Sequence, residues 1–463
     1  MEDLKIDTYI LEASREFKIK IIKEYLSPIL EIPKVIIEEE RKDRESILMF
    51  KNIKEFENYI AISNILNTRR KLRKLLNANN DEDVYRKILN AIDSIDSKLV
   101  GIVEVSNHDY KVLKDFDITK FPFAKFYDNE YDRYLTSGVV IGLDISTGFV
   151  NMSIHRLTPI DKNHLVIRLV PRHLYSIWCR NRDLGKDTPI AIVWTINPVF
   201  LLAAACSPPF GYPELNLIEK FVGFPVKVFF DDYEIPIPVD AEIVMIGKLL
   251  KEGQHIEGPY ADILRLYDDV RMQPIIEIEK VYIQNWRNRT FVHYLVPGLG
   301  EHRILMSIEK EAKIWKYVSN VVPKVKAVRL TPGGGSWLHA VISISKNTDG
   351  DAKNAIIAAF AAHPSLKHVV VVDDDIDVDD PEQVEWAIAT RFRADEDLVI
   401  IRNVRGSTLD PSCIDQSTGL TVKVGIDATK PLKNSHKFEI VKNSVHVEYS
   451  YEELSNVDSI DWF

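Results

Sequence analysis

Apolar and polar residues follow different spacings in three consecutive regions of this chain. Residues 1–104 combine segments of helical spacing with short strand-like runs, and residues 298–463 do the same. Residues 105–297 instead hold many short runs of β-branched and aromatic residues, which are typical of strands. We therefore predict an N-terminal α/β region, a central barrel-like β domain and a C-terminal α/β domain, within one α+β multidomain fold.

The same spacings predict the individual elements of each region. The first region is predicted to have helices at 10–25, 64–76 and 81–99, and strands at 34–38 and 46–50. The second is predicted to have strands at 139–144, 191–196, 226–230, 243–246 and 275–283, and a short helix at 198–205. The third is predicted to have strands at 325–330, 338–344 and 369–372, and helices at 304–318, 351–362, 381–391 and within 445–463.

Three polar residues stand out in the central region, because they mark the ends of two predicted strands, 151–157 and 165–170. Asn151 begins the first strand, Arg156 lies near its end, and His173 follows the second. The residues between the strands have the composition of a hairpin turn. An antiparallel pair can bring such residues together, where an amide, an imidazole and a nearby carboxylate would bind a divalent cation. An ordinary hairpin with polar ends explains the pattern equally well.

Acidic residues further along the chain supply the carboxylates that such a site needs. Glu242 begins a predicted strand and can join the amide and the imidazole as a metal ligand, although an exposed glutamate at a strand end is commoner. Glu257 and Asp262 flank a Gly-Pro turn and can face one point. One can stay ionised beside Arg156, while the other, if buried, can hold a proton and donate it. Taken alone, this segment is also compatible with a simple polar turn.

A run of acids at 373–377 follows a predicted strand and offers a competing function. Its Asp-x-Asp spacing resembles the metal motif of nucleotide-sugar transferases, which would make the protein a metal-dependent glycosyl or nucleotidyl transferase. The same acids can equally cap the next helix at its N-terminus and bind neighbouring basic side chains. The glycines at 333–335 lack the Gly-Lys-Ser/Thr ending of a P-loop and indicate a plain turn.

Composition narrows the class of protein without identifying it. The net charge of −10 argues against nucleic acid as the main partner. No stretch approaches the ~18 uninterrupted apolar residues of a membrane span, and the first residues lack a signal-peptide pattern. The cysteines have neither disulfide nor zinc spacing, which indicates reduced thiols in a cytoplasmic protein. They are Cys179, Cys206 and Cys413.

Seven short segments, taken in order, resemble the UbiD-type decarboxylases, which use prenylated FMN. They are Thr147-Gly-Phe-Val-Asn151, Ser153-Ile-His-Arg156, Pro171-Arg-His173, Ala241-Glu-Ile-Val244, Glu257-Gly-Pro259 with Asp262, Val369-Val-Val-Val-Asp-Asp-Asp-Ile-Asp377 and Gly425-Ile-Asp-Ala-Thr429. The resemblance implies an N-terminal α/β part, a split β-barrel of the flavin-reductase type that binds the cofactor, and a C-terminal α/β domain used in oligomerisation. It thus implies a homo-oligomer with domains at 1–104, 105–297 and 298–463.

The resemblance also implies roles for individual residues. Asp262 matches the proton donor, although many relatives have the longer glutamate there. Glu257 would orient Arg156, which would support the cofactor and the substrate carboxylate. The residues that match the ligands of a manganese-type ion, which holds the cofactor phosphate and often has a potassium ion beside it, are Asn151, His173 and Glu242. The implied cofactor contacts are Asn151, Ser153, Ile154, His155, Arg156, Arg172, His173 and Glu242.

Three further segments resemble an archaeal branch of this family. They are Pro171-Arg-His-Leu-Tyr175, Thr331-Pro-Gly-Gly-Gly-Ser-Trp-Leu-His-Ala-Val341 and Val384-Glu-Trp-Ala-Ile-Ala-Thr-Arg-Phe392. Members of that branch are linked to decarboxylation of trans-anhydromevalonate 5-phosphate to isopentenyl phosphate in a modified mevalonate route. A phosphorylated substrate would need cationic contacts, for which Arg172 and His155 are candidates. A flavin prenyltransferase would supply the cofactor.

Other functions remain compatible with the sequence alone. The nearest is the same chemistry on an aromatic or polyprenyl-hydroxybenzoate acid. A second is the transferase based on the acids at 373–377, and a third is a non-catalytic assembly protein or cofactor carrier.

Overall fold

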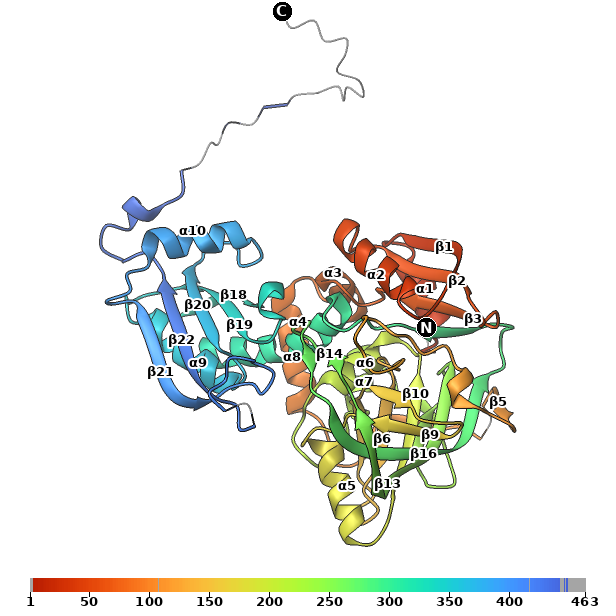
Figure 1. Ribbon diagram of the computed structural model, residues 1–463. Coiled ribbons are helices and arrows are strands. Elements are labelled where there is room, and N and C mark those ends of the chain that lie inside the picture. The colour runs from red at the N-terminus through yellow and green to blue at the C-terminus, as the bar shows by residue number, and fades with distance from the viewer. Residues whose placement is uncertain (1–2, 107, 416, 442–444, 446, 449–463) are drawn as a thin grey trace, which may run out of the picture.

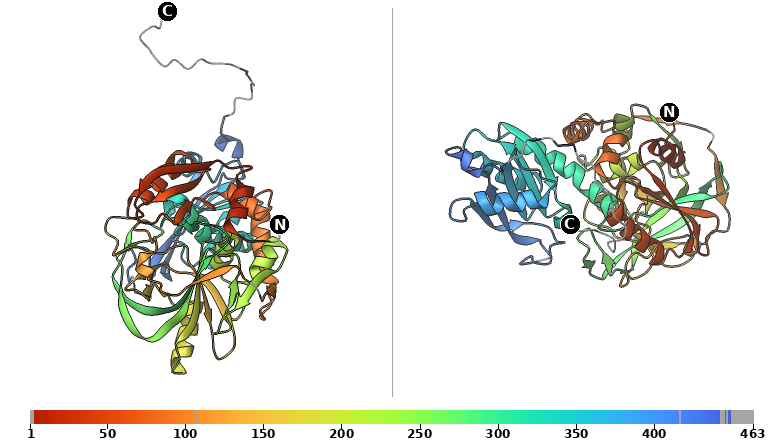
Figure 2. Two further views of the ribbon diagram at one scale, coloured as in Figure 1. Left: turned by 90° about the vertical axis from the view of Figure 1, so that its right-hand side faces the viewer. Right: turned by 90° about the horizontal axis from the view of Figure 1, so that it is seen from above.

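The computed structural model describes residues 3–106, 108–415, 417–441, 445 and 447–448. Within this part of the chain, the N-terminal and central regions lie against each other, and the C-terminal domain extends to one side (Figure 1). The long helix α8 (Gly300–Ser319) joins the two parts and contacts helix α4 (Asp81–Asp93) of the N-terminal region and α9 (Asp351–Ala362) of the C-terminal domain (Figures 1 and 2).

The N-terminal region is built on a four-stranded sheet with strands from two distant parts of the chain. Its order is β1 (Ile19–Leu26), β2 (Ile47–Ile53), β3 (Tyr59–Ser63) and β17 (Thr290–His293). The helices of this region are α1 (Ile6–Ala13), α2 (Glu31–Lys42), α3 (Arg69–Leu75) and α4. Strand β17 falls in the range predicted for the central domain, yet it pairs with β3 of the N-terminal sheet. The limits at 1–104, 105–297 and 298–463 stay a prediction.

Two N-terminal elements differ from the prediction. The helix predicted at 10–25 ends at Ala13, and its second half is strand β1, which pairs in parallel with β2. Cross-strand pairing therefore outweighs the helical spacing of this segment. The strand predicted at 34–38 lies inside helix α2, because Ile32 and Ile36 are both fully buried one helical turn apart.

The central region forms an eight-stranded sheet, and its two edge strands are neighbours in sequence. The order is β7 (Val150–Ile154), β6 (Val139–Leu143), β10 (Thr188–Trp194), β13 (Ile243–Glu257), β16 (Arg271–Gln284), β9 (His164–Ile167) and β8 (Leu157–Pro159), with β5 (Tyr110–Leu113) paired to β16. Only His155 and Arg156 separate β7 from β8, so the sheet must curl until its edges nearly meet. The predicted barrel-like arrangement is confirmed as this half-barrel. The predicted hairpin exists as β8–β9, but the predicted strand 151–157 breaks at 155–156.

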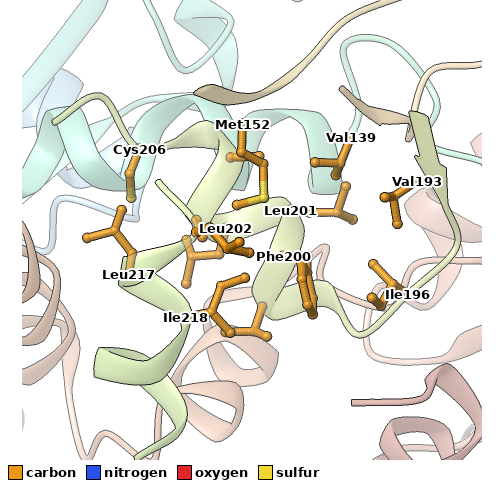
Figure 3. Packing of buried hydrophobic residues seen from close by; sticks show 14 of the residues in the cluster. Val139, Met152, Val193, Ile196, Phe200, Leu201, Leu202, Cys206, Leu217 and Ile218 are labelled. Carbon is orange, nitrogen blue, oxygen red and sulfur yellow. The ribbon is translucent and has the colours of Figure 1, made fainter. Parts of the chain in front are cut away.

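Strand β10 shows how the curled sheet is buried on both faces. All its residues are buried, and alternate side chains enter different cores. Ile192 and Trp194 contribute to one core, while Ala191 and Val193 contribute to the other. Helices α6 (Pro198–Ala205) and α7 (Asn216–Val222) cover the second core (Figure 3). The helix predicted at 198–205 is thus confirmed, and it packs directly behind β7 and β6.

The C-terminal domain is a five-stranded sheet between helices. Its order is β18 (Lys324–Leu330), β19 (His339–Ser345), β20 (His368–Asp373), β22 (Leu420–Ala428) and β21 (Leu398–Arg405). Val369 and Val371 of β20 face a core with α8 and α9, whereas Val370 and Val372 face α10 (Pro381–Arg391). The predicted helices 351–362 and 381–391 are confirmed to the residue. The helix predicted within 445–463 falls almost entirely outside the described residues.

The remaining elements are short. They are β4 (Ile102–Glu104), β11 (Val226–Phe230) and β12 (Pro236–Pro238) in a small sheet, the pair β14 (Tyr260–Ala261) and β15 (Tyr267–Asp268), helix α5 (His173–Asp183), and the 3₁₀ turns η1 (Ile118–Lys120), η2 (Pro332–Gly334) and η3 (Ser435–Phe438). Turn η2 holds the glycines predicted as a plain turn. No helix within the described ranges has the length and apolar character needed to cross a bilayer.

Candidate active site

One half of the site brings together Asn151, His173 and Glu214, which we call the Asn151 cluster. Asn151 lies on β7, His173 begins α5, and Glu214 lies just before α7. Asn151 Nδ2 donates to Glu214 Oε1 at 2.8 Å, and His173 Nδ1 lies 3.2 Å from the same oxygen. The Asn151 and Glu214 side chains are buried, while the His173 side chain keeps 26% exposure. The cluster thus offers an amide, a carboxylate and a partly accessible imidazole at one edge of the half-barrel.

The hydrophobic core behind β7 fixes the position of Glu214. Met152, the next residue after Asn151, points into the core with Leu202 of α6 and Leu217 of α7 (Figure 3). The main-chain N–H of Met152 donates to Glu214 Oε2 at 2.8 Å. Both carboxylate oxygens are therefore held by β7, and the loop that carries Glu214 is anchored at each end by a buried helix.

The prediction that Glu242 completes this cluster is wrong. Glu242 is fully buried before β13, where its carboxylate pairs with Arg287 and accepts a hydrogen bond from the Phe291 N–H at 2.9 Å. In the sheet register, Asn151 stands level with Gly247, three strands away. At about 4.8 Å per strand, this separation alone is roughly 14 Å.

Glu214 was not predicted from the sequence, because it lies in a loop for which no helix or strand was predicted. The signal was a single acid between two apolar helical segments, 198–205 and 216–222. A charged residue in such a setting is costly to bury without a partner, and this cost makes Glu214 a candidate metal ligand.

Ser153 and His155 extend the hydrogen bonds of Asn151 along β7 and past its end at Ile154. Ser153 Oγ lies 3.0 Å from Asn151 Oδ1 and 2.9 Å from His155 Nε2. His155 Nδ1 donates to the main-chain oxygen of Arg168 at 3.0 Å, which leaves Nε2 as an acceptor in the neutral ring. The Ser153 hydroxyl donates to Asn151 Oδ1, and this amide oxygen keeps a second lone pair.

The structure removes His155 as a cationic contact for a phosphate. Burial lowers the pKa of His155 to about 4, so the ring is neutral at neutral pH. Both ring nitrogens also have protein partners. Arg172 is exposed at the N-cap of α5, directly before His173, and stays a predicted contact of the cofactor.

The other half of the site is a buried ionic network around Arg156. Arg156 Nε and Nη2 donate to the two carboxylate oxygens of Glu257 at 2.6 and 2.7 Å. Nη2 also donates to Asp268 Oδ2 at 3.0 Å, and the guanidinium lies 4.2 Å from the centroid of the Tyr260 ring. The predicted pairing of Arg156 with Glu257 is confirmed. The sequence analysis did not single out Asp268.

Asp268 balances several cations in this network. Arg168 Nε and Arg271 Nη2 approach its carboxylate at 3.4 and 2.8 Å, in addition to Arg156. Burial alone would raise the pKa of Asp268, but the arginines lower it below its ordinary value. Asp268 is therefore ionised. Together with Glu257, it is one of the two carboxylates that pair with Arg156 in the described network.

Asp262 lies in the turn between β14 and β15, the two strands that carry Tyr260 and Asp268. Its Oδ1 accepts a hydrogen bond from the Leu264 N–H at 2.8 Å. Burial raises the pKa of Asp262 to about 6, helped by the negative charge of Asp268 and opposed by main-chain N–H groups and Arg156. A carboxyl group with this pKa can both hold and release a proton near neutral pH.

The acids at 373–377 have structural partners instead. Arg391 Nη1 lies 2.9 Å from Asp373, and its Nη2 lies 2.8 Å from Asp375. Lys430 Nζ contacts Asp375 at 3.1 Å, and Lys326 Nζ donates to the main-chain oxygen of Asp374. These contacts tie β20 to α10 and to the segment after β22. The arrangement fits the structural interpretation of this run, not a transferase metal site.

The half-barrel with its two clusters defines the class of protein, and comparison with known proteins agrees. Models of the N-terminal, Rift-related and C-terminal domains of 3-octaprenyl-4-hydroxybenzoate carboxy-lyase match residues 11–92, 102–299 and 303–428. The chain belongs to this family, the UbiD family.

Individual relatives can then be named. A protein called anhydromevalonate phosphate decarboxylase from Aeropyrum pernix is 46% identical over 381 residues, which cover 81% of this chain and 83% of the relative. The UbiD-class enzyme HmfF from Pelotomaculum thermopropionicum, solved with FMN, superposes with a TM-score of 0.88 at 30% identity, covering 95% of this chain and 97% of that one. An evolved dimeric form of HmfF, solved with prFMN, gives a TM-score of 0.85 at 29% identity over the same shares.

Proposed function

We propose that this protein is a prenylated-FMN-dependent carboxy-lyase that converts trans-anhydromevalonate 5-phosphate to isopentenyl phosphate and carbon dioxide. The observation that carries the proposal is the buried Arg156–Glu257 pair beside Asp262, whose pKa is raised to about 6. The name of the Aeropyrum pernix relative supports the substrate, and FMN and prFMN in HmfF support the cofactor. The route would be the modified mevalonate pathway of archaea.

The residues present fit a divalent cation that anchors the cofactor phosphate. Within the described residues, no cluster of three or more His, Cys, Asp and Glu side chains is suited to a metal ion. A cation here would therefore use the amide oxygen of Asn151 together with His173 and Glu214. This is a hard oxygen and nitrogen donor set that suits Mn²⁺, and the second lone pair of the amide oxygen, beside the one that accepts from Ser153, fits the same role. A potassium ion beside it is part of the proposal.

The half-barrel would serve as the split-barrel cofactor domain of the flavin-reductase type. Ser153, Ile154 and His155 at the end of β7, with Arg172 at the start of α5, would line the cofactor between the two clusters. When bound there, prenylated FMN supplies the electron sink that loss of carbon dioxide requires. The protein contributes position, charge and a proton.

Arg156 would hold the carboxylate of the acid, and Glu257 would keep the guanidinium in place through two parallel hydrogen bonds. Asp262 would give its proton to the carbon that carbon dioxide leaves. In balance, one carboxylate and one proton become carbon dioxide and a new C–H bond. The ionised Asp262 then regains a proton from solvent, which its pKa of about 6 permits.

The decisive experiment uses protein co-expressed with a flavin prenyltransferase, the proposed supplier of the cofactor, in a cytoplasmic setting. An absorbance and mass spectrum first identifies the bound flavin. Carbon dioxide release is then measured with trans-anhydromevalonate 5-phosphate and, separately, with 4-hydroxybenzoate. We expect release from the phosphorylated acid alone. Release from the aromatic acid alone would favour the alternative substrate class, and release from neither by loaded protein would refute the proposal.

The assembly of the protein is also a proposal. The dimeric form of HmfF and the implied role of the C-terminal domain support a homo-oligomer. Light scattering of the loaded protein tests it, with a monomer as the contrary result.

A further inference from the structure

A group of basic side chains lies directly beside the turn that carries Asp262. The main-chain N–H of Arg265 donates to Asp262 O at 3.0 Å, which closes the turn. Gly298, just before α8, packs against this turn, because a Cβ added there would collide with the Arg265 side chain and lie 3.2 Å from Asp262 O. The Arg265 side chain therefore rests on the start of α8, within one turn of the proposed proton donor.

The first turn of α8 adds Arg303 to this group. Its Nε is buried without a hydrogen-bond partner. Neither guanidinium, of Arg265 or of Arg303, forms a hydrogen bond or ion pair with another side chain in the described part of the chain. Burial and then repulsion from Arg265 lower the pKa of Arg303. A buried donor without a partner is costly, so the Nε–H of Arg303 favours an anion at this place, and the exposed Arg265 adds positive charge on the solvent side.

The surrounding charges leave this group positive. The acid whose negative charge raises the pKa of Arg303 most is Glu40. Glu40 already accepts a hydrogen bond from Asn67 at 2.7 Å and lies 3.8 Å from Arg44 Nε. With Arg44 matched to Glu40, neither Arg265 nor Arg303 forms a salt bridge within the described residues, although the buried Glu130 lies in the same region. A phosphate monoester carries up to two negative charges near neutral pH and offers three acceptor oxygens.

His302 connects this group to the Arg156 network. Its Nδ1 accepts the Gly298 N–H at 3.1 Å, so the neutral ring carries its proton on Nε2 and presents it as a donor. Burial lowers the pKa of His302 to about 4, and the positive charges of Arg303 and Arg156 add to this effect. The ring thus lies within the electrostatic reach of both arginines and stays neutral at neutral pH.

We propose that Arg265, Arg303 and the Nε2–H of His302 bind the phosphate of the substrate. This inference rests on the proposed function and deepens it by assigning the residues that select a phosphorylated acid. Five bonds separate the protonated carbon of that acid from its phosphorus, a span of roughly 6 Å, because each bond of about 1.5 Å advances an extended zigzag chain by only about 1.25 Å. A phosphate site must therefore lie close to the proton donor, and this group begins three residues after Asp262.

The test compares two acids that differ only in the phosphate, trans-anhydromevalonate 5-phosphate and trans-anhydromevalonate. It uses the loaded holoenzyme and the variants Arg303→Gln and Arg265→Gln, with Arg393→Gln as the matched control. Arg393 is 62% exposed and pairs only with acids of its own loop. Each site variant should raise KM for the phosphorylated acid by about 10- to 100-fold, the value of a charged hydrogen bond. For the unphosphorylated acid, kcat/KM should change less than about threefold in each variant.

A binding measurement separates this inference from the proposed function. Calorimetry with isopentenyl phosphate should show binding to the wild type and the Arg393→Gln variant, and at least about tenfold weaker binding to each site variant. Equal losses on both acids, or unchanged KM and binding, would overturn the phosphate site while leaving the decarboxylase intact. If the wild type turns over neither acid, the proposed function fails, and the calorimetry alone decides the phosphate site. Thermal midpoints of all variants confirm that each is folded.

Discussion

The Asn151 cluster lies on β7, the Arg156 network begins at the junction between β7 and β8, and the two differ in how their charges are balanced. In the network, Arg156 and Arg168 face Glu257 and Asp268, and Glu257 has no exposed side-chain surface. In the cluster, the carboxylate of Glu214 faces an amide and an imidazole with 26% exposure. The network is complete in the sense that both of its carboxylates are paired with guanidinium groups, with Arg271 as a third cation, whereas the carboxylate of the cluster is one that a metal ion would neutralise. The network is suited to orient the substrate, and the cluster is suited to bind a metal ion.

The largest effect is expected from the variant Glu257→Gln, which removes one carboxylate from the Arg156 network. This change leaves Arg156 buried with only Asp268 as its ionic partner, and loss of one member of a buried pair costs about 3–5 kcal/mol. The thermal midpoint should fall clearly. Decarboxylation should fall at least about 100-fold, since the guanidinium loses its bidentate anchor. Retention of activity would mean that Asp268 alone orients Arg156.

The next largest effect is expected in the Asn151 cluster, where two variants test whether Glu214 or Glu242 is the metal ligand. Glu214→Gln should weaken Mn²⁺ binding by about 100-fold, because the only carboxylate of the cluster is removed. The matched variant Glu242→Gln should keep the Mn²⁺ affinity within about twofold, although it leaves Arg287 with only the more distant Asp7 as an ionic partner among the described residues and lowers the thermal midpoint. Metal content and affinity are measured by elemental analysis and titration. The reverse pattern would restore Glu242 as the ligand.

The same contrast explains how much the sequence could predict. Of the network, Arg156 and Glu257 were predicted, because the family resemblance pairs them. Asp268 was not singled out, because only the β14–β15 pair brings it back to Arg156. The cluster was found in two of three members. Glu242 and Glu214 are both buried acids at the ends of elements, and only the register of the curled sheet shows which one faces Asn151.

The fold shows a similar limit. The helices 351–362 and 381–391 were predicted to the residue, and the second has clear sequence signals in the Asp380 cap and Pro381 in its first turn. Strand β1 and helix α2 were not, because their apolar residues fit both spacings and the choice depends on what they pack against. The number and order of strands in the half-barrel also follow from pairings between distant segments, which no local pattern contains.

A smaller and graded effect is expected from pH. The pKa of Asp262 is raised to about 6, so its proton-donating form is fully present below that pH and is lost as the pH rises through it. The rate should then fall about tenfold per pH unit on the alkaline side. Asp262→Asn should remove activity while leaving flavin binding intact.

Asp268→Asn sharpens the pH test, because it links Asp262 to the network. Removing the negative charge of Asp268 favours ionisation of Asp262, so its pKa should fall and the alkaline limb should move to lower pH. A limb that stays in place would assign the titration to another group.

The smallest effect on activity is expected in the C-terminal domain, with Asp375→Asn. A transferase based on this run would lose its metal ligand, whereas the structure gives Asp375 to Arg391 and Lys430, far along the chain from either half of the site. Decarboxylation should therefore stay within about twofold of the wild type, while the thermal midpoint falls by a few degrees through the loss of about 1–2 kcal/mol of charged hydrogen bonds. The control Asp374→Asn changes an exposed acid of the same run, whose carboxylate contacts only Ser345, and should leave both quantities unchanged. A large loss of activity in Asp375→Asn with an unchanged midpoint would show that the C-terminal domain takes part in the chemistry, and that the division of labour between the two clusters is incomplete.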